Sequence, residues 1–248
     1  MPEVYGLIGK KLTHSFSKNY FSEKFEREGL KDKSYKLFEL ENIDELTQII
    51  KNNPDLKGLN VTIPYKEAVI PFLDQIDPSA RKIGAVNVIK VNTGHLYGYN
   101  SDFYGFRESL VRWIDDQDNL KALVLGTGGA SKAVMAALDD LSIPYLLVSR
   151  KKDHDLIDYE HLTANPDIVK AHRLIINTTP LGMYPHTDTC PDLPFSHIQT
   201  GHYLYDLVYN PEKTKFLQLG EARGAHIKNG LEMLHLQAEK SWELWQQD

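Results

Sequence analysis

The sequence contains a single cysteine, no excess of basic residues and no long uninterrupted hydrophobic segment. Cys190 alone cannot form an internal disulfide, which fits a reducing compartment, and it has no cysteine partner for a metal site. The formal net charge of -6 argues against a broad basic surface for nucleic acid. No apolar run reaches the roughly 18 residues that a membrane span needs, and no signal sequence precedes the first strand. We therefore expect a soluble, cytoplasmic protein that binds neither nucleic acid, membrane nor metal.

The most informative segment is a glycine-rich turn near the middle of the chain. An apolar run at 122–125 ends in glycines, and a helix-like run of small residues follows at 130–138. This order of strand, turn and helix opens a dinucleotide-binding unit, where backbone N–H groups and a helix N-terminus face a pyrophosphate. Gly126, Gly128 and Ser131 match the G-x-G-x-x-G/A pattern without its strict third glycine. Alone, the turn is equally compatible with an ordinary strand-to-helix connection.

The next predicted strand, at 145–148, ends in a basic segment. Its continuation is Ser149, Arg150, Lys151 and Lys152. An NAD site holds a carboxylate at this position for the ribose 2′-hydroxyl, whereas a guanidinium suits a 2′-phosphate because it binds bidentately. Since no carboxylate occurs here, the sequence favours NADP over NAD, and the alternative is a solvated basic turn.

Strands and helices alternate along the chain. The predicted strands lie at 4–8, 35–40, 59–63, 122–125, 145–148, 174–177 and 203–208. The segments 85–91 and 95–99 flank Asn92-Thr93-Gly94, which predicts a hairpin that adds an antiparallel edge. A last helix is expected from about 231 to 245.

This alternation predicts an α/β protein of two lobes with a cleft between them, where ligands usually bind. Residues 1–101 plus 231–248 are expected to form an N-terminal substrate-binding and catalytic lobe with a mainly parallel sheet. Residues 102–230 are expected to form a C-terminal, Rossmann-type NADP-binding lobe.

Polar side chains gather where the predicted strands of the first lobe end. They are Ser15, Ser17, Thr62, Lys66, Asn87, Asn100 and Asp102. In open α/β sheets, ligand-binding groups come from the carboxyl ends of strands. Taken singly, each fits a structural role; Ser15, Ser17 or Asp102, for example, can cap a helix. Together they predict a small polyhydroxylated acid as the ligand.

Several segments, in the same order, resemble those of the shikimate dehydrogenase family. They are Ser-x-Ser at 15–17, Asn-Val-Thr-x-Pro-x-Lys at 60–66, Gly-Ala-Val-Asn at 84–87, Gly-x-Asn-[Thr/Ser]-Asp-x-x-Gly at 98–105, Gly-x-Gly-Gly-Ala at 126–130, Asn-x-[Thr/Ser]-Pro-x-Gly-Met at 177–183, Asp-Leu-Val-Tyr-Asn-Pro at 206–211 and Gly-Leu-Glu-Met-Leu-His-Leu-Gln-Ala at 230–238. The likeness runs nearly end to end. The chain departs from the family at Lys18, at Ser101 and in Ser149-Arg150-Lys151, where proline, threonine and Asn-Arg-Thr are usual.

The resemblance implies NADP-dependent reduction of 3-dehydroshikimate to shikimate, on the route to chorismate and the aromatic amino acids, with a small-molecule substrate. It makes Lys66 the acid/base and Asp102 its partner at the reacting oxygen. The implied substrate-binding residues are Ser15, Ser17, Thr62, Lys66, Asn87, Asp102, Tyr209 and Gln237. The implied cofactor-binding residues are Gly126, Thr127, Gly128, Gly129, Ala130, Ser149, Arg150, Lys151, Lys152, Thr178, Leu207, Gly230 and Met233. We expect a monomer or a homodimer.

Three alternatives remain open. The first is an NAD(P)-dependent quinate/shikimate dehydrogenase, against which the basic segment at 150–152 argues. The second is a non-catalytic, ligand-sensing relative, although such a protein has no need to retain Lys66 and Asp102. The third is a methylene-tetrahydrofolate dehydrogenase, which the Ser-x-Ser segment, Tyr209 and Gln237 fit poorly.

Overall fold

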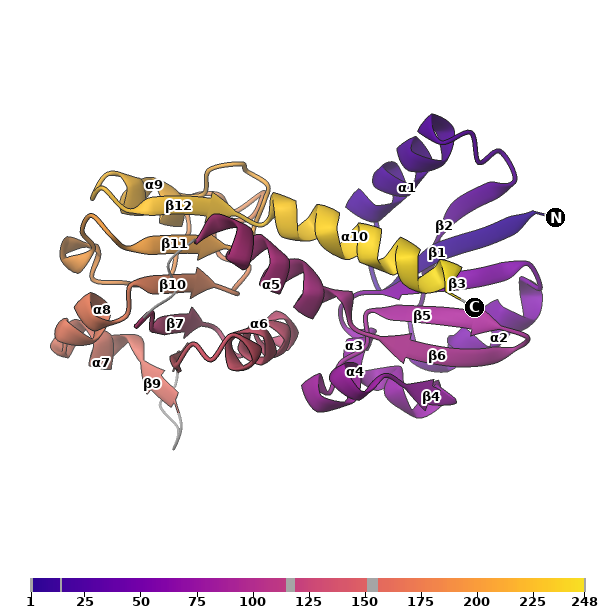
Figure 1. The fold of residues 1–248 in the computed structure, drawn as a ribbon, viewed down its shortest axis with the longest axis horizontal. Helices are drawn as coiled ribbons and strands as arrows, with labels where there is room; N and C mark the ends of the chain where they lie inside the picture. The colour runs from indigo at the N-terminus through magenta and orange to yellow at the C-terminus, as the bar shows by residue number, and fades with distance from the viewer. Residues whose placement is uncertain (1, 14, 115–118, 151–155, 248) are drawn as a thin grey trace. The chain divides into compact units, whose positions relative to one another are not determined.

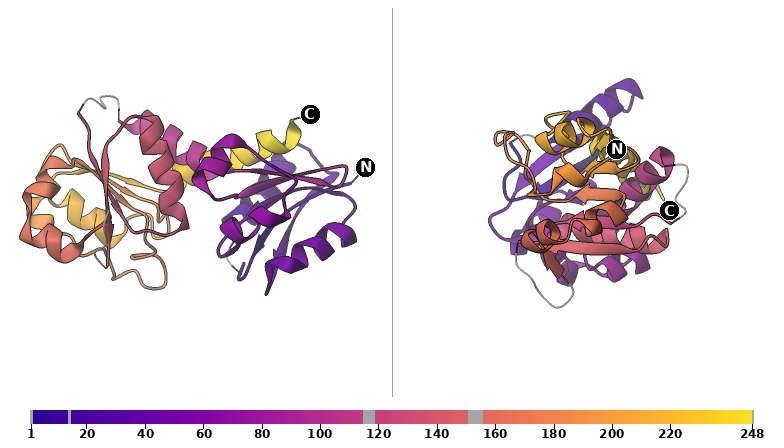
Figure 2. Two further views of the ribbon diagram at one scale, coloured as in Figure 1. Left: turned by 90° about the horizontal axis from the view of Figure 1, so that it is seen from below. Right: turned by 90° about the vertical axis from the view of Figure 1, so that its left-hand side faces the viewer.

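The computed structural model describes residues 2–13, 15–114, 119–150 and 156–247. The chain divides into two compact units, each an α/β layer structure (Figure 1). Unit 1 comprises Met1–Ser101 and Gln237–Asp248, and unit 2 comprises Asp102–Leu236. Within each unit, helices cover both faces of the sheet (Figure 2). The predicted α/β class is confirmed, while the domain boundary predicted at residue 231 stays a prediction.

Unit 1 is built on a sheet that, among the described residues, has six strands in the order β2-β1-β3-β5-β6-β4. Its elements are β1 (Glu3–Gly9), α1 (Phe16–Arg27), β2 (Lys33–Glu39), η1 (Ile43–Glu45), α2 (Leu46–Asn52), β3 (Leu56–Val61), α3 (Tyr65–Ala68), η2 (Ile70–Phe72), β4 (Gln75–Ile76), α4 (Pro78–Ile83), β5 (Val88–Asn92) and β6 (His95–Tyr99). Strand β1 pairs in parallel with β2 and β3, whereas β5 is antiparallel to β3 and β6.

The predicted hairpin forms as β5 and β6, with Thr93 and Gly94 at positive φ in its turn. The prediction that this hairpin is the edge of the sheet is wrong, because β4 pairs in parallel outside β6. The backbone N–H of Leu96 donates to Asp74 Oδ2 (2.7 Å) and helps hold the β4 segment there. A strand of two residues leaves no periodic pattern in a sequence, which explains the error.

The core of unit 1 includes the end of the chain. One face of the sheet carries an aromatic cluster in which Tyr5, Phe21 and Phe25 pack with Trp245 from the last helix, α10 (Leu231–Gln246). A methyl group at Gly58 of β3 would collide with the Trp245 indole, so glycine at this position allows the close packing. The indole Nε1 also donates to the Ile89 carbonyl oxygen (3.0 Å). Burial of each such side chain contributes about 1.5–3 kcal/mol, which ties the C-terminal half of α10 to the N-terminal strands.

Unit 2 is built on a sheet that, over the described residues, has six strands in the order β12-β11-β10-β7-β8-β9, with every pairing parallel. Its elements are α5 (Ser101–Trp113), β7 (Ala122–Leu125), α6 (Gly129–Asp140), β8 (Tyr145–Ser149), β9 (Leu156–Asp158), α7 (Tyr159–Ala164), α8 (Asp167–Ala171), β10 (Leu174–Asn177), η3 (Phe195–His197), β11 (Tyr203–Asp206), α9 (Lys215–Glu221), β12 (His226–Asn229) and the start of α10. Strands β7 and β10 are buried along their whole length. Such strands appear in a sequence as continuous hydrophobic runs, and for this reason the sequence predicts β7 and β10.

No helix in the described part of the chain is both long and apolar enough to cross a membrane.

Candidate functional site

The glycine-rich turn lies between β7 and α6. Gly126 has a φ of 103°, and a methyl group there would lie 2.8 Å from Thr179 Cγ2, so this position requires glycine. Gly128 caps α6 without a side-chain hydrogen bond. A methyl group at Gly128 or Gly129 would meet nothing within 4 Å. The N-terminus of α6 therefore offers open backbone N–H groups, which fit a dinucleotide pyrophosphate.

Other predicted cofactor residues follow the neighbouring strands at the same edge of this parallel sheet. Thr178 follows β10, and its Oγ1 donates to the Leu125 carbonyl oxygen (2.7 Å) at the end of β7. Ser149 is the last residue of β8, and the exposed Arg150 comes next. An exposed cation therefore follows β8 at this edge, as the sequence predicts. The predicted residue Thr127 lies in the turn itself and Ala130 lies in the first turn of α6, whereas Lys151 and Lys152 lie outside the described residues.

Leu207 and Gly230, two of the residues predicted to border the nicotinamide, are in contact. A methyl group at Gly230 would collide with the Leu207 carbonyl oxygen, so only glycine allows this approach. Gly230 directly precedes α10, whose first turn carries the third predicted residue, the buried Met233. Tyr209, predicted to bind substrate, is half-buried two residues after Leu207.

A buried carboxylate lies beneath this segment. Asp206, the last residue of β11, is fully buried and accepts hydrogen bonds from Asn177 Nδ2 (2.9 Å), Thr214 Oγ1 (2.5 Å) and the Val208 N–H (3.0 Å). Burial raises the pKa of Asp206 to about 6, although its hydrogen-bond donors act in the opposite direction. Asp206 thus fixes the start of the segment that carries Leu207 and Tyr209.

The predicted substrate residues of unit 1 follow its strands. Ser15 caps α1 by accepting from the Lys18 N–H (3.2 Å), which is the structural role that its sequence position also predicts. Ser17, in the first turn of α1, is hydrogen-bonded to the buried Tyr35 hydroxyl. Thr62 follows β3 and lines an open depression of about 400 Å³. The other residues that line this depression are Lys10, Lys11, Ile63 and Pro64.

The two predicted catalytic residues belong to different compact units. Lys66 is half-buried in α3 of unit 1, and its carbonyl oxygen accepts from the Val86 N–H (2.8 Å), so α3 is tied to the segment that leads to Asn87. Asp102 is the first residue of unit 2 and is buried in the first turn of α5.

Asn87 and Gln237 meet within unit 1, although 150 positions separate them in the chain. Asn87 Nδ2 donates to Gln237 Oε1 (3.4 Å) and to Ser101 Oγ (3.0 Å). Their neighbours Tyr35, Asn60 and Ser241 complete a buried polar cluster. The sequence signalled Asn60 and Ser101 only as members of motifs, and nothing in the sequence singled out Tyr35 or Ser241.

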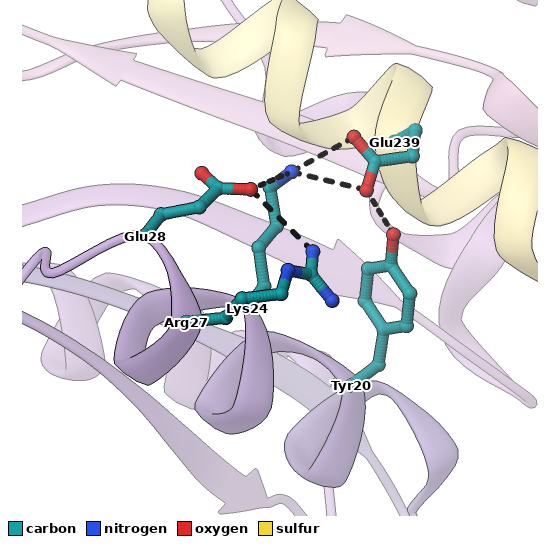
Figure 3. A network of polar contacts seen from close by, with 5 residues as sticks. All are labelled: Tyr20, Lys24, Arg27, Glu28 and Glu239. Atoms are coloured by element: carbon teal, nitrogen blue, oxygen red, sulfur yellow. Dashed lines mark hydrogen bonds and ion pairs between the residues drawn. The ribbon is translucent and has the colours of Figure 1, made fainter.

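A network of charged and polar side chains fastens α1, which carries Ser17, to the C-terminal half of α10 (Figure 3). Lys24 is nearly buried, and its Nζ contacts Glu239 Oε2 and Glu28 Oε1, each at 2.9 Å. Tyr20 also donates to Glu239. Burial lowers the pKa of Lys24, but these carboxylates outweigh it, so the net shift is upward. The ammonium group therefore stays charged between the two helices.

Every buried side-chain nitrogen or oxygen in the described part of the chain has a hydrogen-bond partner. Within the same residues, no group of three or more His, Cys, Asp or Glu side chains is arranged to hold a metal ion.

The chain is similar to known proteins of one family. The family model described as "Shikimate dehydrogenase substrate binding domain" matches residues 7–89. A protein of Clostridium beijerinckii named shikimate dehydrogenase (NADP(+)) is 43% identical, over 99% of this chain and 92% of its own. The crystal structure of shikimate dehydrogenase 1 from Peptoclostridium difficile is 40% identical, with a TM-score of 0.84, and covers 98% of this chain and 92% of its own.

A solved structure with ligands is also similar. The shikimate 5-dehydrogenase of Thermus thermophilus, in complex with NADP(H) and shikimate, has a TM-score of 0.85 and 30% identity, and covers 98% of this chain and 93% of its own. These similarities extend over both units rather than over one motif. The chain therefore belongs to the shikimate dehydrogenase family.

Proposed function

We propose that the protein catalyses the reversible, NADP-dependent reduction of 3-dehydroshikimate to shikimate. The observation that carries the proposal is the edge of the unit 2 sheet, where the N-terminus of α6 has no side-chain cap and where β8 is followed by Arg150 and not by a carboxylate. The relatives named shikimate dehydrogenase (NADP(+)) support the same substrate and cofactor. The polar groups of unit 1 suit a small acid with several hydroxyls.

Ketone reduction requires a hydride at the carbonyl carbon and a proton at the carbonyl oxygen. The reduced nicotinamide supplies the hydride when it is bound. Lys66 donates the proton from Nζ to the developing alkoxide and regains one from solvent. The Asp102 carboxylate orients the ammonium group of Lys66 and the reacting oxygen. In the reverse direction Lys66 accepts the hydroxyl proton.

The remaining residues bind and orient the two ligands. Ser15, Ser17, Thr62, Asn87, Tyr209 and Gln237 hold the carboxylate and hydroxyl groups of the substrate. The backbone from Gly126 to Ala130 holds the pyrophosphate, with Thr178 beside it. Leu207, Gly230 and Met233 border the nicotinamide, and the segment that begins at Ser149 binds the adenosine 2′-phosphate. We extend the proposal to a cytoplasmic monomer or homodimer whose substrate lobe is 1–101 plus 231–248 and whose cofactor lobe is 102–230.

The decisive experiment measures reduction of NADP or NAD in the presence of shikimate or quinate. We expect the highest kcat/KM with shikimate and NADP. Lys66→Ala should reduce kcat by about 10²–10⁴, as expected for loss of a general acid/base. The matched control is Lys82→Ala, which removes an exposed lysine from α4 and should leave kcat unchanged.

Other outcomes of this assay select the alternatives. Faster turnover of quinate with NAD would identify a quinate/shikimate dehydrogenase. Binding of shikimate without turnover of either substrate would identify a ligand-sensing relative. Normal turnover by the Lys66→Ala variant would remove Lys66 from the mechanism.

The cofactor preference is tested at Arg150. Arg150→Ala should raise the KM for NADP about 10- to 100-fold and change that for NAD little, because only NADP carries the 2′-phosphate. Arg223→Ala is the matched control, because Arg223 is also exposed but precedes β12 and so lies at the opposite edge of the parallel sheet. Equal losses for NADP and NAD in Arg150→Ala would contradict the 2′-phosphate assignment.

A further inference from the structure

A continuous chain of buried hydrogen bonds links the predicted substrate residues of unit 1 to α10. The Ser101 N–H donates to Asn87 Oδ1 (2.6 Å), and Asn87 Nδ2 donates to Ser101 Oγ (3.0 Å). Ser101 Oγ contacts Ser241 Oγ (3.2 Å), and Ser241 Oγ donates to the Gln237 carbonyl oxygen (2.8 Å). Ser101 and Ser241 are fully buried, so water does not substitute for these partners.

Backbone groups at both ends determine the direction of every bond in this chain. A backbone N–H can only donate, so the Asn87 atom that faces Ser101 N is Oδ1, and its other atom is the Nδ2 donor. A carbonyl oxygen can only accept, so the single proton of Ser241 points to Gln237 O. The proton between the two hydroxyls must then come from Ser101.

The same logic fixes the amide of Gln237. Because Asn87 Nδ2 is a donor, the Gln237 atom that meets it is Oε1, at 3.4 Å. Gln237 Nε2 is therefore the amide atom that has no partner within the described residues. Under the proposed function, Gln237 presents a hydrogen-bond donor to an oxygen of the substrate.

Ser241 stands at the junction of two branches. Besides Ser101, its Oγ accepts from Asn60 Nδ2 (3.0 Å). Asn60 Oδ1 in turn accepts from the Tyr35 hydroxyl (2.8 Å), which is hydrogen-bonded to Ser17. One hydroxyl group on α10 thus connects the side chains that lead to Ser17, Asn87 and Gln237.

We propose that Ser241 is a positioning residue for the substrate side of unit 1: it holds the Asn60 amide directly and orients the Ser101 hydroxyl that accepts from Asn87 Nδ2, so that Gln237 turns Nε2 towards the substrate. Ser241 does not touch the substrate in this proposal, which rests on the proposed function for the identity of that substrate. Removing its hydroxyl leaves Asn60 Nδ2 with only the long contact to the Asn87 carbonyl oxygen (3.4 Å). It also deprives the Ser101 hydroxyl of its acceptor, so this hydroxyl can turn and the hydrogen bond that Ser101 Oγ accepts from Asn87 Nδ2 weakens, while the Ser101 N–H still holds Asn87 Oδ1.

The test is Ser241→Ala, which removes one hydroxyl and almost no volume. We expect the KM for shikimate to rise about tenfold, as for loss of a buried hydrogen-bond partner, while the KM for NADP stays within about twofold. The control is Ser109→Ala in unit 2. Ser109 is equally buried and is hydrogen-bonded to Tyr205 (2.9 Å) and Glu232 (3.3 Å), so it should lower stability without changing the KM for shikimate. An unchanged KM for shikimate in Ser241→Ala, or equal rises for both ligands, would overturn the proposal.

Two further measurements separate this proposal from the proposed function. Gln237→Glu keeps an acceptor for Asn87 but replaces Nε2 by an oxygen, so it should weaken shikimate binding at least tenfold; unchanged binding would refute the assigned orientation. Exchange of the side-chain NH2 protons of Asn60 and Asn87, followed by NMR without ligand, should be slow in the wild type and faster in Ser241→Ala. This readout holds even if shikimate is not the substrate, and equal exchange rates in the two proteins would contradict the positioning role.

Discussion

Both units bury polar side chains beneath the carboxyl ends of their strands, but with different chemistry. In unit 1 the buried groups are the neutral amides of Asn60 and Asn87 and the hydroxyl of Ser241. In unit 2 the central group is the carboxyl of Asp206, which three donors surround. Unit 1 thus holds the loops at the ends of its strands with uncharged groups, whereas unit 2 holds them with an ionisable group.

This difference determines how each unit responds to its environment. Amides and hydroxyls do not titrate near neutral pH, so the network of unit 1 keeps the same bonds across that range. Burial raises the pKa of Asp206 to about 6, so the charge of its carboxyl group changes at pH values close to neutral. The prediction is that unit 2 is the more sensitive of the two to pH and to single substitutions.

Removal of the central acceptor should have the largest effect. Asp206→Ala leaves Asn177 Nδ2, Thr214 Oγ1 and the Val208 N–H without their buried acceptor, and we expect a loss of about 3–4 kcal/mol in the free energy of unfolding. Asn60→Ala removes neutral bonds only and should cost about 2 kcal/mol. Urea denaturation at pH 7 measures both, and an equal loss would break the comparison between the units.

The second-largest effect should be that the free energy of unfolding depends on pH through Asp206. The folded protein holds the proton of Asp206 with a pKa of about 6, against a usual value of 3.8. The folded state therefore binds this proton more tightly, and the resulting stabilisation is complete below pH 4 and disappears as pH rises through 6. The difference of about two pKa values corresponds to about 3 kcal/mol.

Asp206→Asn mimics the protonated carboxyl and isolates this contribution. The free energy of unfolding of the wild type relative to Asp206→Asn should fall by about 3 kcal/mol between pH 4 and pH 7. Urea denaturation at several pH values gives this difference, because other carboxyl groups titrate in both proteins. A constant difference would show that Asp206 does not couple to pH.

The smallest effect is expected where charge lies near the surface of unit 1. Glu239→Gln removes one partner of Lys24 but leaves Glu28 at 2.9 Å, and the Glu239 side chain is half-exposed, so the cost should be about 0.5–1 kcal/mol. The loss should shrink in 1 M salt, because salt screens exposed charges. Glu243→Gln, whose exposed side chain pairs with Lys240, is the control and should cost less. A loss as large as that of Asp206→Ala would contradict the ranking of buried over exposed groups.

The sequence predicted those parts of the fold whose signals are local. Strands β7 and β10 are buried on both faces and appear as hydrophobic runs, and the turn at Thr93-Gly94 marks the hairpin. Strands β4, β9 and β12 have two to four residues, and helices α7, α8 and α9 have five to seven. These elements lack the continuous hydrophobic run of β7 and β10 and are too short to show a periodicity, so packing determines them.

In the candidate site, too, the sequence predicts the features with a local signal and misses those that depend on long-range contacts. Motifs single out Lys66, Asn87 and the glycine-rich turn as candidates, because each motif is contiguous in the chain. The bonds that orient these residues join positions far apart, as between Asn60 and Ser241, and no local pattern reveals them. The sequence shows Asp206 only as the first residue of a motif, because its buried partners Asn177 and Thr214 lie elsewhere in the chain.

The path of α10 has a consequence for synthesis of the protein. Unit 2 is one uninterrupted stretch, Asp102–Leu236, and contains its whole sheet and core, whereas unit 1 requires Gln237–Asp248. On the ribosome, the aromatic surface of Tyr5, Phe21 and Phe25 must therefore wait for Trp245, which is made more than two hundred residues later. The segment made first is thus the one completed last, and throughout translation it is the part of the chain most in need of protection from aggregation.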